Sequence, residues 1–315
     1  MGVKDVAEPR IAVILPCYNE EAAIAQTVAG FRAALPTARI YAYDNNSRDR
    51  TVEVARAAGA IVRTERVQGK GAVVRRMFAD VDADVYVMAD GDATYDAASA
   101  PALVARLLDE QLDMVVGSRV HEAAAAYRRG HQFGNKALTG MLARLFGRSF
   151  TDILSGYRVF SRRFVKSFPA LSAGFEIETE ISVHALELKM PVAEVSTPYF
   201  ARPEGSASKL STYGDGWRIA TTIATLYRIE RPLLFFGAIG GLLALVAVLL
   251  ALPLVFTYLQ TGLVPRFPTA ILATGLIILA SLCGFAGLIL DTVVRGRREV
   301  RRLAYLAHPA PGTAD

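Results

Sequence analysis

The sequence predicts an α/β domain built on a parallel sheet, followed by a hairpin of two membrane-spanning helices. Short apolar runs rich in β-branched residues alternate with segments whose apolar residues recur every three or four positions. This alternation is typical of a parallel sheet that helices cover on both faces. Closer to the C-terminus, residues 232–265 and residues 267–290 contain no charged side chain. Each of these runs exceeds the roughly 20 residues that span a bilayer.

The elements of the α/β domain follow one another at short intervals. Strands are predicted at 11–15, 40–43, 61–63, 85–89, 113–116, 155–160 and 192–199. Helices are predicted at 24–35, from 47 or 49 to 59, after the turn at 68–71 through 77, from 99 onward, and at 175–187. A further amphipathic helix, 213–231, is expected to lead into the first apolar run.

Two aspartates, Asp90 and Asp92, follow the central strand directly, and Gly91 lets the backbone turn between them. Carboxylates placed in this way suit Mg²⁺ or Mn²⁺ that keeps some water and gains further ligands from a substrate diphosphate. Taken alone, such a pair also fits a solvated acidic turn. Two more polar clusters, at 16–20 and 44–47, follow the first two predicted strands. Because ligands bind outside the carboxyl ends of parallel strands, the three clusters together indicate a binding site.

Composition limits the kinds of molecule that the protein is expected to bind. The net charge of +5 is modest, and many basic residues lie near the apolar runs, which favours anionic lipid over nucleic acid. A basic amphipathic segment at 127–148 fits either a packed surface helix or a membrane-facing one. The only two cysteines, Cys17 and Cys283, fall in different parts of the chain, and the four histidines form no cluster. We therefore expect free thiols, with neither a disulfide nor a zinc site.

Seven motifs in order resemble glycosyltransferase family 2, and within it the membrane-anchored bacterial enzymes similar to dolichol-phosphate mannose synthase. They are LPCYNE (15–20), DNNSRDRT (44–51), GKGAVVR (69–75), ADGD (89–92), GSR (117–119), LSGYRVFSR (154–162) and RPEGSASKL (202–210). The resemblance implies a nucleotide-sugar-binding domain of GT-A type, a nucleotide-diphosphate sugar as donor, and a polyprenyl phosphate of undecaprenyl type as acceptor.

The resemblance also implies roles for individual residues on the donor side. Base and ribose would be held by Pro16, Tyr18, Glu20 and Asp44. The donor diphosphate would be met by Lys70, by Arg119 and by a loop carrying Arg202 and Lys209. The metal would be bound by Asp92 with Asp90, around Gly91. Some relatives carry a glutamine ligand where this chain has Thr94, a weaker ligand, so the coordination of the metal and the choice between Mg²⁺ and Mn²⁺ stay open.

On the acceptor side, the resemblance points to Arg128 or Arg129 for the lipid phosphate, with the choice between the two left open, and to Ser155 and Arg158. Asp152 is similar to the catalytic aspartate of the family. A hydroxyl acceptor needs such a base to lose its proton. A phosphate monoester has a second pKa of about 6 and is largely ionised near neutrality, so it needs less help from a base. With such an acceptor, Asp152 would orient groups as much as it would abstract a proton.

These expectations define a domain plan and its alternatives. We expect a cytoplasmic catalytic domain (1–210), a juxtamembrane amphipathic helix (211–231), a transmembrane part (232–294, with helices at 233–258 and 267–290) and a basic cytoplasmic tail (295–315). The expected reaction is an inverting transfer at the cytoplasmic membrane, and a homo-oligomer is left open. The alternatives are a transferase with a hydroxyl acceptor and a non-catalytic module that binds nucleotide sugars.

The arginine distribution predicts the membrane topology. Five arginines lie between 295 and 302, whereas the loop between the apolar runs carries only Arg266. The positive-inside rule then places both chain ends in the cytoplasm. A reporter fused after Asp315 should read as cytoplasmic, and one inserted beside Gly262 should read as external. An external C-terminal reporter would contradict the hairpin topology.

Overall fold

The computed structural model describes residues 8–121, 139–141, 143–144, 150–170, 176–203, 221, 225 and 228–312. Contacts divide the chain into two compact units. One unit comprises Met1–Trp217 together with Arg301–Asp315, and the other comprises Arg218–Val300. We call them the catalytic-fold unit and the hairpin unit.

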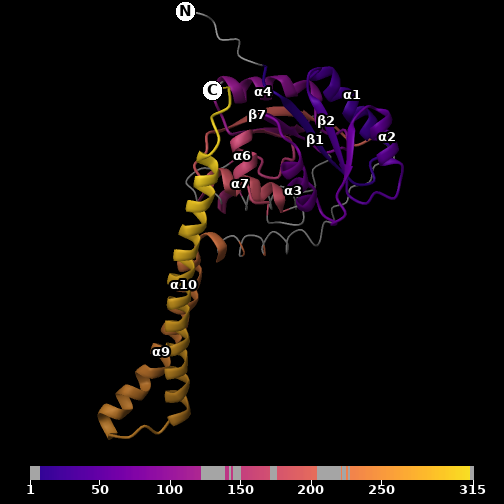
Figure 1. Cartoon of the computed structure of the whole chain (residues 1–315). Coiled ribbons are helices and arrows are strands. Elements are labelled where there is room, and N and C mark those ends of the chain that lie inside the picture. The colour runs from indigo at the N-terminus through magenta and orange to yellow at the C-terminus, as the bar shows by residue number, and fades with distance from the viewer. Residues whose placement is uncertain are drawn as a thin grey trace, which may run out of the picture. The chain divides into compact units, whose positions relative to one another are not determined.

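Strands and helices alternate through the catalytic-fold unit, as predicted (Figure 1). The strands are β1 (Ile11–Cys17), β2 (Arg39–Asp44), β3 (Ile61–Thr64), β4 (Val85–Met88), β5 (Met114–His121), β6 (Arg158–Ser161) and β7 (Val192–Tyr199). The helices are α1 (Ile24–Ala34), α2 (Thr51–Ala57), α3 (Lys70–Asp80), η1 (Ala97–Ser99), α4 (Ala100–Asp109), α6 (Arg162–Ser167) and α7 (Ile177–Glu187).

The strands form one seven-stranded sheet in the order β3-β2-β1-β4-β6-β5-β7. The pairs β3–β2, β2–β1, β1–β4 and β5–β7 are parallel, whereas β6 runs antiparallel to both of its neighbours. The predicted α/β class is confirmed, but the sheet is mixed rather than wholly parallel. Hydrophobic patterning locates a strand such as β6 without giving its direction, because side chains alternate in the same way in both orientations.

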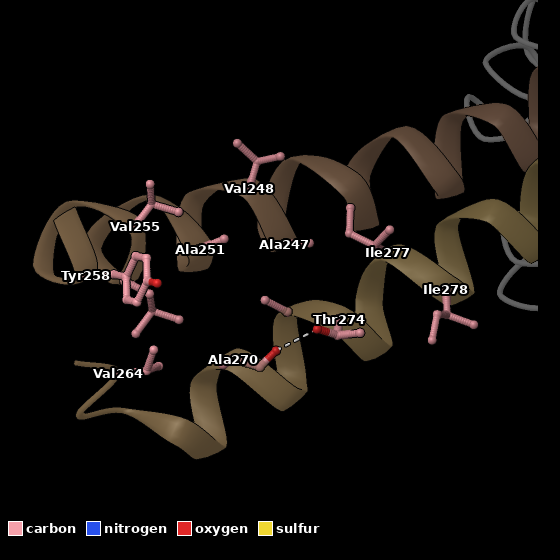
Figure 2. A pocket seen from close by; sticks show the side chains of 12 residues that line it. Ala247, Val248, Ala251, Val255, Tyr258, Val264, Ala270, Thr274, Ile277 and Ile278 are labelled. Carbon is pink, nitrogen blue, oxygen red and sulfur yellow. Dashed lines mark hydrogen bonds between the residues drawn. The ribbon is translucent and has the colours of Figure 1, made fainter. Parts of the chain in front are cut away.

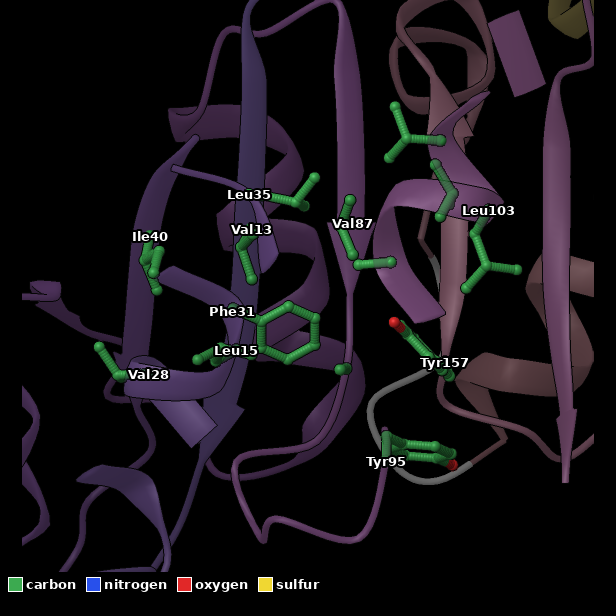
Figure 3. Packing of buried hydrophobic residues seen from close by; sticks show 14 of the residues in the cluster. Val13, Leu15, Val28, Phe31, Leu35, Ile40, Val87, Tyr95, Leu103 and Tyr157 are labelled. Carbon is green, nitrogen blue, oxygen red and sulfur yellow. The ribbon is translucent and has the colours of Figure 1, made fainter. Parts of the chain in front are cut away.

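Alternating side chains of the sheet pack against helices on both faces. On one face Val13 and Leu15 of β1 join a buried cluster with Phe31 of α1 and Leu103 of α4 (Figure 3). On the other face the aromatic ring of Phe78 from α3 packs edge-on against the strands and α6; its partners are Tyr86, Phe160 and Phe168. The sheet is therefore fixed between two helical layers, and its strand ends are rigid supports for polar loops.

The C-terminal residues of the catalytic-fold unit dock on the buried Asp113, which directly precedes β5. Tyr305 donates its hydroxyl to Oδ2 of Asp113 at 2.8 Å, and Ser161 donates to Oδ1 at 2.7 Å. Arg163 forms an ion pair with the same carboxylate and lies over the ring of Tyr305. Nearby, Arg301 pairs at 2.5 Å with Glu187 at the end of α7, whose side chain is fully buried. The tail predicted at 295–315 is thus helical through Leu306.

The hairpin unit consists mainly of the long helix α9 (Pro232–Thr261) and of α10 (Phe267–Leu306) up to Val300. Glycines allow their backbones to approach closely: a Cβ on Gly240 would lie 2.9 Å from the carbonyl oxygen of Ala280. Close approach through small residues is how helices associate in bilayers. At the start of α9 the buried carboxylate of Glu230 pairs with Arg297 and Arg298, at 3.4 and 3.2 Å.

Both helices are long and apolar enough to cross a membrane, with mean hydropathy of 2.8 and 2.2 over their most apolar windows. Only 17% and 11% of those windows is buried inside the protein, so neither is the core helix of a soluble fold. Side chains from both helices, most of them apolar, line a groove of about 540 Å³ (Figure 2). These features indicate association with a membrane.

Removal of the Tyr305 hydroxyl should destabilise the catalytic-fold unit. Tyr305→Phe leaves the buried Asp113 with one donor fewer and should cost about 1 kcal/mol of unfolding free energy. Thermal unfolding in detergent measures this as a lower Tm. Tyr258→Phe, at a tyrosine of α9 that is 54% exposed, is the matched control and should leave Tm unchanged. Equal Tm values for both variants would contradict the docking role of Tyr305.

Candidate active site

The three polar clusters expected after the first, second and fourth strands lie at one edge of the sheet. Strand register produces this arrangement: Cys17 at the end of β1 is aligned with Asp44 at the end of β2, and Ile14 of β1 with Met88 of β4. The backbone of Asn45 then donates to the carbonyl of Cys17 at 2.9 Å. We call this place, formed by residues 16–20, 44–47 and 89–92, the strand-end edge.

The first two clusters hold each other in place. The backbone amide of Asn19 donates to the Ser47 hydroxyl at 2.9 Å, and its side-chain oxygen accepts from the amide of Arg48 at 2.8 Å. The amide of Glu20 donates to the Thr51 hydroxyl at 2.8 Å. Asn19 has a φ of 52°, a left-handed conformation that asparagine tolerates better than most residues. The loop after β1 is therefore fixed to the loop after β2.

The residues expected to hold base and ribose all lie in these two loops. Glu20 and Asp44 are buried, with 6% and 5% of their surface exposed, and Pro16 and Tyr18 are half-buried. Both carboxylate oxygens of Asp44 accept from the backbone amide of Ser47, at 3.2 and 3.3 Å. Strand geometry thus brings the four residues together.

Asn45 connects the strand-end edge to the loop before α3. Its side-chain nitrogen donates to the carbonyls of Glu65 and Val67 at 2.9 and 2.8 Å. Its side-chain oxygen accepts from the backbone of Gly69 at 2.7 Å and from Gln68 at 3.2 Å. Four bonds from one buried amide therefore determine where α3 begins.

Gly91 is required because the turn between the two aspartates has no room for a side chain. A Cβ at Gly91 would lie 2.8 Å from Sγ of Cys17 and 3.2 Å from Cδ1 of Ile24. Packing of this turn against β1 and α1 directs the flanking carboxylates of Asp90 and Asp92 and limits their movement.

Asp92 is the more deeply placed aspartate, with 3% of its surface exposed. Its Oδ1 accepts from the Thr94 hydroxyl at 2.6 Å, and its Oδ2 pairs with Arg202 at 2.7 Å. Burial, and next the charge of Asp90, raise the pKa of Asp92, although Thr94 and Arg202 oppose the shift. A carboxylate destabilised in this way gains from a second positive charge close to it.

Lys70, the first residue of α3, lies between two carboxylates. Its Nζ is 2.5 Å from Oδ1 of Asp90 and 2.6 Å from Oε1 of Glu178. Burial alone would lower the pKa of Lys70, but the charges of Asp90 and Glu178 raise it above its usual range, so the ammonium stays charged. Gly156 packs against this pair, since a Cβ there would lie 3.0 Å from Asp90 Oδ2 and 3.2 Å from Lys70 Nζ.

Arg119 and Asp152 form a two-pronged ion pair with each other. Nε of Arg119 lies 2.7 Å from Oδ2 of Asp152, and a terminal guanidinium nitrogen lies 2.8 Å from Oδ1. Arg119 also lies over the ring of Tyr199, at 5.5 Å. Burial would raise the pKa of Asp152, but the hydrogen bonds and charge of Arg119 outweigh it and lower that pKa. Asp152 is therefore a carboxylate at neutral pH.

Ser155 and Arg158, expected on the acceptor side, are fully buried in the structure. Ser155 donates to the carbonyl of Gly117 at 2.6 Å. The Arg158 guanidinium donates to the carbonyls of Ser155 and Ile153, at 2.8 and 2.5 Å, and to the Ser182 hydroxyl at 2.9 Å. Burial lowers the pKa of Arg158 to about 10. Both residues shape the 152–156 segment and offer no exposed surface to an acceptor.

The carboxylates at the strand-end edge fit a divalent cation that a substrate diphosphate completes. Within the described ranges, no group of three or more His, Cys, Asp or Glu side chains is arranged to hold a metal by itself. Mg²⁺ commonly binds one or two carboxylates together with water and phosphate oxygens, and Asp90 with Asp92 supplies such a pair. The Thr94 hydroxyl donates its hydrogen to Oδ1 of Asp92, so Thr94 holds the Asp92 carboxylate in position.

Three expected site residues, Arg128, Arg129 and Lys209, lie outside the described residues, as do most of residues 211–231. Glu178, Asn45 and Gly156 are site residues to which sequence reasoning assigned no role. Glu178 stands in the first turn of α7, close to Glu176 and Glu180. Acidic side chains are common there because the positive end of the helix dipole stabilises them, so only burial distinguishes Glu178 from its neighbours.

Comparison with known proteins places this arrangement in a family. The family profile described as Glycosyl transferase family 2 matches residues 12–168. Glycosyltransferase AglJ of Haloferax volcanii is 31% identical over 291 residues, which cover 92% of this chain and 95% of AglJ. The dolichyl-phosphate hexose transferase of the same organism is 29% identical over 222 residues, or 70% of this chain and 95% of that protein.

A solved structure shares the fold. The crystal structure of glucosyl-3-phosphoglycerate synthase from Mycobacterium tuberculosis, in complex with Mn²⁺, UDP and glucosyl-3-phosphoglycerate, superposes with a TM-score of 0.57. It is 24% identical and covers 70% of this chain and 80% of that one. The chain belongs to glycosyltransferase family 2, as its motifs predicted.

A methyl group at Gly156 should disturb the Asp90–Lys70 pair. We expect Gly156→Ala to lower transfer activity about tenfold or more, because one displaced charge-assisted hydrogen bond is worth about 1.5–3 kcal/mol. Initial rates with saturating substrates measure the effect, and Tm should change little. Gly275→Ala, at a glycine of α10 with no atom near its Cβ position, is the control and should retain activity. Full activity in Gly156→Ala would show that the Asp90–Lys70 pair has no role in transfer.

Proposed function

We propose that this protein transfers a sugar, with inversion, from a nucleotide-diphosphate sugar to a polyprenyl phosphate of undecaprenyl type at the cytoplasmic face of the membrane. The observation that carries the proposal is the meeting of Asp90, Asp92, Lys70 and Arg202 at the strand-end edge, in a chain that also contains two membrane-length apolar helices. The first group suits a diphosphate with a divalent cation, and the helices suit a lipid substrate.

On the donor side, Glu20, Asp44, Pro16 and Tyr18 would hold the base and ribose. Lys70 and Arg202, joined by Lys209, would bind the diphosphate, because guanidinium and ammonium groups pair well with phosphate oxygens. Mg²⁺ or Mn²⁺ held by Asp92 and Asp90 would neutralise charge on the departing diphosphate. The solved relative was crystallised with Mn²⁺ and UDP, which supports this assignment of the donor class.

On the acceptor side, Arg128 or Arg129 would pair with the lipid phosphate. A phosphate monoester oxygen, already ionised near neutrality, then attacks the anomeric carbon as the bond to the nucleotide diphosphate breaks. The nucleophile needs no strong base, and this agrees with an Asp152 whose carboxylate is held by Arg119. Asp152 would orient the acceptor, and Arg119, its ion-pair partner, would face the donor diphosphate, while Ser155 and Arg158 support the segment that carries Asp152. A relative named dolichyl-phosphate hexose transferase supports the acceptor class.

A hydroxyl acceptor is the second candidate, and Asp152 itself favours it. An ionised carboxylate beside the site can accept the proton of a hydroxyl, and the ion pair with Arg119, which lowers its pKa, makes it a weaker base than a free aspartate. The solved fold relative, a glucosyl-3-phosphoglycerate synthase, was crystallised in complex with phosphoglyceric acid. The two candidates differ in the oxygen that attacks the anomeric carbon, which is a phosphate oxygen in one and a hydroxyl oxygen in the other.

The test compares acceptors that differ only in the phosphate. Purified protein in detergent is incubated with Mn²⁺, a panel of labelled nucleotide sugars, and either undecaprenyl phosphate or undecaprenol. Labelled lipid should form with undecaprenyl phosphate alone. Transfer to undecaprenol or to a soluble hydroxyl, with none to the phosphate, would contradict the proposed acceptor. A non-catalytic binding module would bind a donor and yield no product with any acceptor.

Asp92→Asn should abolish transfer while preserving the fold. The substitution keeps size and shape but removes the charge that attracts the cation. Asparagine keeps an acceptor oxygen for the Thr94 hydroxyl, and the loss of the Arg202 ion pair is offset because burial disfavours the charge that is removed, so the unfolding free energy should change by about 1 kcal/mol. Activity and Tm are measured together over a range of Mn²⁺ concentration. Turnover near that of the wild type would show that Asp92 is not a metal ligand needed for transfer.

A further inference from the structure

Glu178 is a charged residue of the site for which the donor and acceptor assignments leave no role. It lies in the first turn of α7, has 4% of its surface exposed, and faces Nζ of Lys70 at 2.6 Å. Charged side chains are seldom so fully buried unless they are paired. A buried glutamate at this position is therefore either a structural partner of Lys70 or a means of controlling it.

The arrangement around Lys70 distinguishes the two carboxylates. Glu178 is a buried residue of α7, and the helix fixes its backbone. The side chain of Asp90, in contrast, is 30% exposed at the strand-end edge. Asp90 is also the partner that a cation or a ribose can engage. When Asp90 changes partner, Glu178 remains as the one anchored carboxylate contacting Nζ.

We propose that Glu178 is a positioning residue that holds the ammonium of Lys70 in place while Asp90 exchanges Lys70 for the donor complex, so that Lys70 meets the donor diphosphate already oriented. This inference rests on the proposed function, because it assumes that a nucleoside diphosphate binds at the strand-end edge. A lysine with a single partner would lose its orientation once Asp90 departed. A lysine with two partners keeps one and turns a remaining N–H toward the phosphates.

The test is a double-mutant cycle on nucleotide affinity, measured by titration calorimetry with the full chain in detergent and Mn²⁺ present. The probe is whichever of UDP, GDP, ADP and dTDP binds the wild-type protein most tightly. Glu178→Gln and Lys70→Met should each raise Kd about 10- to 100-fold, the range for one charge-assisted hydrogen bond. Because Glu178 acts through Lys70, the double variant should be no weaker than Lys70→Met alone.

Glu180→Gln is the matched control, since Glu180 occupies the same turn of α7 but is half-exposed. Its Kd should equal that of the wild type. Should Glu178→Gln fold poorly, Glu178→Asp keeps the charge on a shorter side chain and should give an intermediate Kd with Tm preserved. An unchanged Kd in Glu178→Gln, or fully additive effects in the cycle, would overturn the inference. If the wild-type protein binds none of the four diphosphates, the proposed function fails first.

Discussion

The register of β1 against β2 and β4 is the constraint on which the rest of the site depends. Parallel pairing aligns Cys17 with Asp44 and Ile14 with Met88, so three polar loops leave the sheet at one edge. A shift of one residue would move each side chain of the shifted strand to the opposite packed face, where it would not fit its neighbours, so the core that stabilises the fold also fixes the loops. Gly91, packed against Cys17, transmits that precision to Asp90 and Asp92.

The charged side chains that crowd this edge need oppositely charged partners within the protein. Lys70 lies between Asp90 and Glu178, Arg202 pairs with Asp92, and Arg119 pairs with Asp152. Buried charges without partners would cost several kcal/mol each, so the pairs are needed for folding. Under the proposed function, a diphosphate with its cation would replace some of these ionic contacts, so that binding would be an exchange of partners in a preformed site.

Sequence patterns predicted the α/β class, the positions of the strands, the two apolar helices and the edge where the polar loops meet. These features depend on local spacing, which a sequence displays directly. The antiparallel direction of β6 and the burial of Arg158 depend on how distant segments pack, and no local pattern encodes either. Glu178 was missed for the same reason: in the sequence it is one of three glutamates at a helix start, and only the packing of α7 against α3 places it on Lys70.

The central claim is that the strand-end edge binds the donor diphosphate through a cation held by Asp90 and Asp92. A crystal structure of the protein with Mn²⁺ and its nucleoside diphosphate tests this most directly, because anomalous scattering locates the manganese. The account predicts one strong anomalous peak within coordination distance of Asp92 and of the diphosphate oxygens, with Lys70 released from Asp90 and still paired with Glu178. A nucleotide bound away from this edge, or bound there with no manganese between it and Asp92, would contradict the account.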